Sequence, residues 1–91
     1  MEAKLMTRHP EGKAGVNIDR QKYDTIKKAI LAELKSGDIS FSDLNKNIKT
    51  KLKGSFDGSI PWYVITVKLD LEARGVIKRV PGSGPQRLCL K

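Results

Sequence analysis

The sequence predicts an α+β fold that is mainly helical, and three observations carry this prediction. Two stretches before residue 54 place apolar residues three and four positions apart, which is the spacing of amphipathic helices. Residues 59–90 then follow as a capped helix, a glycine stop and a tight hairpin, with no linker between them. A hairpin this short must pack on the helices, because an isolated one is marginally stable in water. Three helices, a C-terminal β-hairpin wing and an N-terminal arm together indicate a winged helix-turn-helix.

The first helix is expected to begin after Asp19, a residue type that accepts a hydrogen bond at a helix N-cap. Ser36-Gly37 is expected to end it, since glycine adopts the left-handed conformation common at helix ends. Its apolar stripe consists of Tyr23, Ile26, Ile30 and Leu34, widened by Ala29 and Leu31.

The second helix is expected to begin after Ser40, which stands at the spacing of a capping box with Asp43 in the usual glutamate position. It should run to about Lys53, where Gly54 stops it. One buried stripe follows from the spacing of Phe41, Leu44, Ile48 and Leu52.

The third helix is expected to begin after Ser59 and to end before Gly75. Residues 76–80 (VIKRV) are rich in β-branched types, residues 81–85 (PGSGP) form a turn, and residues 86–90 (QRLCL) alternate like a half-buried strand. At 100° per residue, one side of this helix carries the core residues Ile60, Val64, Val67 and Leu71.

Residues 1–18 lack helical periodicity and are expected to form an arm, or an extra strand at Val16 to Ile18. Pro10, Gly12 and Gly15 interrupt any longer element there. The winged helix-turn-helix domain is therefore expected to span residues 19–91.

Composition narrows the function classes. With 91 residues, the chain is long enough for one small core. No apolar run approaches the roughly 18 residues that span a membrane, and no signal-peptide core is present, so a cytoplasmic location is expected. His9 and Cys89 give no metal-ligand spacing, and no motif pairs a nucleophile with a base. We therefore expect neither a metal, nor a cofactor, nor an enzymatic activity.

The charge distribution favours nucleic acid as the partner. The chain has a net charge of +8, and residues 76–91 contribute four basic and no acidic side chains. A local basic cluster in a protein of pI near 9.8 is typical of nucleic-acid binding. We expect contacts to the phosphates of double-stranded DNA, and hence a possible role as a transcription regulator. The candidate residues are, in order, Lys78, Arg79 and Arg87 on the wing; Lys46, Lys49, Arg8 and Lys13; and, on the third helix, Thr66, Lys68 and Arg74.

A second apolar stripe on the third helix supports an alternative. Trp62, Ile65 and Leu69 lie opposite its core side, with Ala73 extending the row. A recognition helix usually presents polar side chains to base edges there. Either the N-terminal arm, a second subunit in a homodimer or another protein is expected to cover the stripe. The alternative function is therefore a protein-interaction module.

Several segments resemble a family of small, uncharacterised prokaryotic proteins assigned to a domain of unknown function. The resemblance rests on TRHPEGKAGVNI and FDGSIPWYVITVKLDLEARGVIKRVPGSGPQRL, and it covers nearly the whole chain. The resemblance implies a winged helix-turn-helix fold and does not imply any particular activity. The neutral, two-sided third helix departs from ordinary winged-helix regulators, which argues against sequence-specific reading of DNA.

Overall fold

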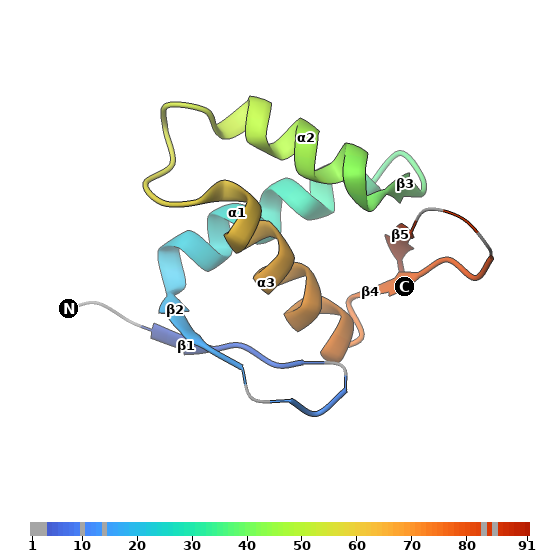
Figure 1. The fold of residues 1–91 in the computed structure, drawn as a ribbon, viewed down its shortest axis with the longest axis horizontal. Helices are drawn as coiled ribbons and strands as arrows, with labels where there is room; N and C mark the ends of the chain where they lie inside the picture. Colours follow the sequence, from blue (N-terminus) through green and yellow to red (C-terminus); the bar gives the residue numbers. More distant parts are fainter. Residues whose placement is uncertain (1–3, 10, 14, 83, 85) are drawn as a thin grey trace.

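Three helices and two small antiparallel sheets make up the part of the chain that the computed structural model describes, residues 4–9, 11–13, 15–82, 84 and 86–91 (Figure 1). This confirms the α+β class. In chain order the elements are β1 (Lys4–Met6), β2 (Asn17–Asp19), α1 (Arg20–Leu34), β3 (Ile39–Ser40), α2 (Phe41–Leu52), α3 (Ile60–Ala73), β4 (Ile77–Arg79) and β5 (Arg87–Leu90).

Local hydrogen bonds fix where the helices begin and end. The side chains of Asp19, Ser40 and Ser59 each accept from the backbone N–H three residues on, at 3.1, 3.1 and 3.4 Å, which confirms the three predicted N-caps. At the end of α3, Gly75 has a φ of +75°, and its N–H donates to Glu72 while that of Val76 donates to Leu71. These two bonds form a Schellman motif, so α3 leads directly into β4.

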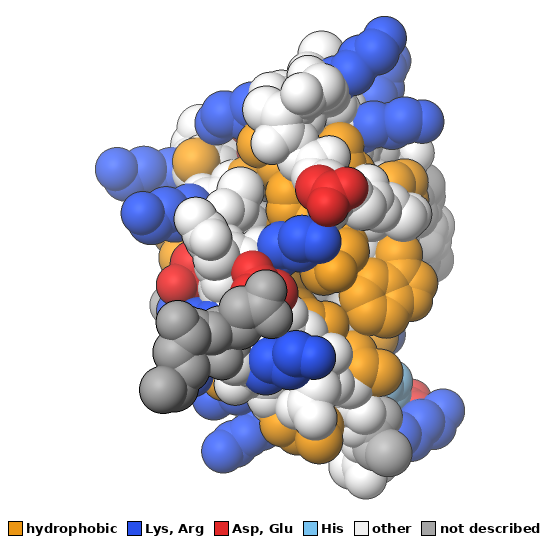
Figure 2. All heavy atoms as spheres, turned by 90° about the vertical axis from the view of Figure 1, so that its left-hand side faces the viewer, with side chains coloured by type: hydrophobic (Ala, Val, Ile, Leu, Met, Phe, Trp, Pro, Cys, Tyr) orange, Lys and Arg blue, Asp and Glu red, His pale blue; other side chains and the backbone are white. Residues whose placement is uncertain are grey.

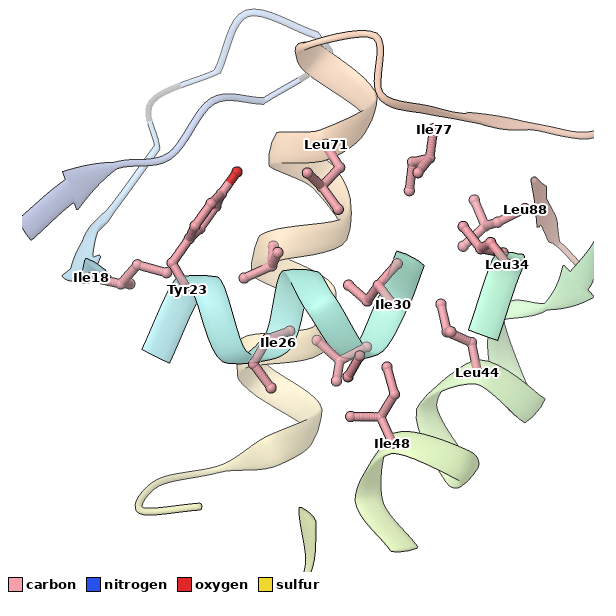
Figure 3. Close-up of a cluster of buried hydrophobic side chains, with 13 residues drawn as sticks. Ile18, Tyr23, Ile26, Ile30, Leu34, Leu44, Ile48, Leu71, Ile77 and Leu88 are labelled. Atoms are coloured by element: carbon pink, nitrogen blue, oxygen red, sulfur yellow. The ribbon is translucent and has the colours of Figure 1, made fainter. Parts of the chain in front are cut away.

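The core joins all three helices to the hairpin (Figure 3). The predicted stripes of α1 and α2 point into it, together with the inner side of α3 and one residue from each hairpin strand. Burial of this apolar surface is the main force holding the elements together. The buried hydrophobic residues are Ile18, Tyr23, Ile26, Ala29, Ile30, Leu34, Leu44, Ile48, Val64, Val67, Leu71, Ile77 and Leu88.

The C-terminal hairpin belongs to a three-stranded sheet whose order is β3-β5-β4. β5 is the central strand: it pairs with β4 through Ile77 and Leu90, and with β3 through Ile39 and Leu88. The sequence did not predict β3, which has only two residues and leads straight into α2. Of the predicted turn at 81–85, Ser83 and Pro85 lie outside the described residues.

The arm folds back as a second hairpin, β1-β2, with Lys4 opposite Asp19. Its strands are tied by Thr7, whose N–H donates to the Val16 carbonyl and whose hydroxyl accepts from the Val16 N–H, both at 2.9 Å. Glycine is required at position 15, because an added Cβ would lie 1.7 Å from the Thr7 carbonyl oxygen. The predicted extra strand is thus present as β2, one residue later than expected. Pro10, taken as a break in this arm, lies outside the described residues.

None of the helices in the described part of the chain is both long and apolar enough to span a membrane.

Candidate nucleic-acid interface

The hairpin presents three basic side chains, and two of them are held by carboxylates. Arg79 donates through Nε to Glu72 at 2.7 Å, and Arg87 donates through a terminal nitrogen to Asp38 at 2.9 Å. Both side chains remain about half exposed, so their other N–H groups are available to a ligand. Lys78 is exposed and makes no ion pair with any described carboxylate.

Beneath the C-terminal hairpin lies a buried ion pair between two residues of α3, and each of its side chains also contacts a residue of the hairpin. Lys68 Nζ is 3.4 Å from Glu72, and the two side chains are only 4% and 6% exposed. The same ammonium donates to Gln86 at 2.8 Å and lies 5.0 Å from the centre of the Phe41 ring. Burial lowers the pKa of Lys68, while the Glu72 carboxylate opposes this change. The expectation that Lys68 faces a ligand is corrected here, because the side chain points under the wing.

A second buried carboxylate joins the arm, α1 and α3. Asp70 is fully buried and accepts from the Tyr23 hydroxyl, from the Arg8 backbone N–H at 2.8 Å, and from Arg74 Nε at 2.8 and 2.9 Å. Burial raises the pKa of Tyr23 first, and its hydrogen bond to Asp70 raises it further. Arg74, expected to reach nucleic acid, instead neutralises Asp70, and a terminal nitrogen donates to Met6 at 3.5 Å.

Sequence reasoning missed both carboxylates. Asp70 and Glu72 each have a basic partner four residues away, Arg74 after the first and Lys68 before the second, and such pairs are common on solvated helix surfaces. The available signal was their position: both residues flank Leu71, the last residue of the predicted core stripe. Residues next to a core position lie at the border of the buried side of the helix, where neighbouring elements can cover them.

The remaining candidates lie on three different elements. Lys46 and Lys49 are exposed on α2, Arg8 and Lys13 are exposed in the arm, and Thr66 is half-buried on α3. Lys13 pairs with Glu11 at 3.1 Å and is the main cause of the lowered pKa of Glu11; Arg79 adds a smaller effect. The arm loop lies close to the C-terminal hairpin, since His9, Glu11 and Arg79 line the same hollow.

The outer side of α3 is apolar and only partly covered. Trp62 and Ile65 are 45% and 42% exposed, and Leu69 is half-buried. Trp62 packs edge-on against Tyr63, with ring centres 4.9 Å apart. The arm contacts the flank of α3 at Asp70 and leaves Trp62 and Ile65 open, so the idea that it covers the stripe is corrected for these two residues. Figure 2 shows hydrophobic side chains gathered right of centre, with both basic and acidic side chains beside them.

Comparison with protein families gives one match. A family described as a family of unknown function, DUF6958, matches residues 4–88, which include the arm and most of the hairpin. Comparison with curated proteins and with solved structures finds no match.

Proposed function

We propose that this chain, which belongs to the family of unknown function DUF6958, is a winged-helix domain that binds double-stranded DNA chiefly through its phosphates. The strand order β3-β5-β4 carries the fold assignment: one short strand precedes α2, and the two strands after α3 form a basic hairpin beside it. That connectivity supports the wing as the electrostatic contact, with transcription regulation as one role for such binding.

The wing suits phosphate contact rather than base reading. Lys78 offers an unpaired ammonium, and the carboxylates on Arg79 and Arg87 orient both guanidinium groups without covering them. Guanidinium groups match phosphate geometry and need fewer rotamers frozen when they are already oriented. The outer side of α3, by contrast, presents Trp62 and Ile65, which together offer one donor, the indole N–H, and no acceptor for reading base edges. Binding should therefore be salt-dependent and weakly selective.

Replacing Lys78 and Arg87 together with alanine tests this proposal. In anisotropy titrations of random duplex DNA, the double variant is expected to bind about tenfold or more weakly, because each charged hydrogen bond is worth about 1.5–3 kcal/mol. The slope of log affinity against log salt concentration, measured between about 50 and about 200 mM, should become shallower by about two released counterions. Arg79 is left intact because it neutralises the buried Glu72.

The matched control replaces Lys28 and Lys35, two exposed lysines of α1 and its end, with alanine. It removes the same charge and should bind nearly as the parent does. Equal losses in both double variants would mean that the wing has no special part in binding.

The exposed Trp62 and Ile65 favour a second candidate function, a docking surface for an acidic amphipathic segment of another protein. The net charge of +8, with basic side chains among those beside the apolar area, favours an acidic partner, whereas a second copy of the chain would bring another net charge of +8. Trp62 is the single tryptophan of the chain, so its fluorescence reports on this surface directly.

A helical peptide with leucine on one side and glutamate on the other should shift the emission of Trp62 to shorter wavelength. Ile65→Glu should abolish the shift, and Lys49→Glu should preserve most of it. No response to the acidic peptide would contradict docking. A sedimenting dimer that Ile65→Glu dissociates would assign the surface to a second copy instead.

A further inference from the structure

Between the arm loop and the wing lies a hollow of about 370 Å³. It is closed on one side by His9 and Glu11 of the arm and on the other by Lys78 and Arg79 of β4. Lys91, directly after β5, and Glu72 of α3 complete the charged lining. The hollow therefore joins two hairpins that lie at opposite ends of the sequence.

The two carboxylates of this hollow each lie within ion-pair distance of a basic side chain. Glu72 contacts Lys68 at 3.4 Å and Arg79 at 2.7 Å, and Glu11 contacts Lys13 at 3.1 Å. Lys78 and Lys91, in contrast, have no described carboxylate within ion-pair distance. The ammonium of Lys91 lies near Gly75, where an added Cβ would be 3.5 Å from it. Two lysines without an ion-pair partner among the described residues thus line one small hollow.

His9 adds a hydrogen-bond donor to the lining. Its Nδ1 accepts from the Glu11 backbone N–H at 3.1 Å. A neutral imidazole that accepts at Nδ1 carries its proton on Nε2, so the other ring nitrogen is a donor. The arm thereby contributes a hydrogen-bond donor to the lining of the hollow, in addition to the cationic groups of Lys78, Arg79 and Lys91.

We propose that this hollow binds a phosphate group, held by Lys78 and Lys91 from the wing side and by His9 from the arm. This proposal rests on the proposed DNA-binding function, because it takes a phosphate of the DNA backbone as the natural ligand. A free phosphate compound would offer the same chemical group. The arm and the wing would then grip one phosphate together, and residues 4–19 would contribute to binding without contacting a base.

His9 is the single histidine, so its ring-proton NMR signals report on the hollow without assignment of the whole spectrum. The full chain is titrated at constant pH and ionic strength with inorganic phosphate, and separately with a short random DNA duplex. Saturable shifts of the His9 signals with both ligands are expected. Lys78→Ala/Lys91→Ala should weaken phosphate binding about tenfold or more. Lys28→Ala/Lys35→Ala should leave it unchanged, and circular dichroism checks that each variant folds.

The outcomes separate this proposal from the proposed function. Shifts with duplex alone assign the hollow to backbone phosphates, and shifts with phosphate alone assign it to a free phosphate compound. If the duplex binds by anisotropy while the His9 signals stay fixed in both titrations, the hollow is not a phosphate site although DNA binding stands. If neither ligand shifts the signals and the duplex does not bind, both proposals fail. If Lys28→Ala/Lys35→Ala weakens phosphate binding equally, the effect comes from overall charge and not from the hollow.

Discussion

Asp70→Ala is expected to destabilise the domain by about 3–5 kcal/mol, because it leaves buried partners without their shared carboxylate. Three groups lose an acceptor at once: the Tyr23 hydroxyl, the Arg8 backbone N–H and the Arg74 guanidinium. A small domain has only about 5–15 kcal/mol of total stability, so this single change should bring the protein close to unfolding at room temperature. Urea unfolding followed by circular dichroism measures the loss.

Asp57→Ala is the matched control, since the Asp57 side chain is fully exposed and its one ion pair within the described part of the chain is with Lys22, at 4.0 Å. An exposed pair of this kind contributes about 0–1 kcal/mol. Similar unfolding midpoints for the two variants would show that Asp70 does not join the arm, α1 and α3 as described.

Glu72→Ala should be the second most damaging change. It leaves the Lys68 ammonium buried with only the Gln86 side chain to bond, and it frees Arg79 from its position on the wing. Breaking a buried ion pair from one side costs about 3–5 kcal/mol, whereas replacing both partners with apolar residues is often neutral. The double variant Lys68→Met/Glu72→Leu should therefore recover most of the stability that Glu72→Ala loses in thermal unfolding.

Glu11→Ala removes an exposed carboxylate near the same wing and serves as the control, with almost no change in stability expected. If Glu72→Ala proves equally mild, water must replace the lost contacts. The pair of Glu72 with Arg79 cannot then be what fixes the wing against α3.

The positions of the three helices could be predicted from the sequence because the signals that define them are local. Asp19, Ser40 and Ser59 cap helices through a residue three positions away, and Gly75 ends α3 through bonds that span a few residues. The apolar stripes are equally local, since helical periodicity alone decides which side is buried.

The strands and the buried charges depended on partners far along the chain. β3 becomes a strand only because Ile39 meets Leu88, and β1 because Leu5 meets Ile18. Asp70 accepts a hydrogen bond from the backbone of Arg8, 62 positions away, and its position beside Leu71 in α3 does not reveal that partner. For the same reason, the sequence predicts ligand contacts for Lys68 and Arg74, whose partners in the hairpin and the arm are distant in the chain.

The order β3-β5-β4 also constrains the route by which the protein folds during synthesis. β5 follows every other described element in the chain, yet it lies at the centre of the sheet. Until residues 87–90 leave the ribosome, β3 and β4 have no strand between them to pair with, and Leu88 is missing from the core. Chains are made from the N-terminus, so the helices can collapse first and the sheet must close last. A nascent chain lacking these four residues would expose two unpaired strand edges, which makes it the stage most prone to aggregation.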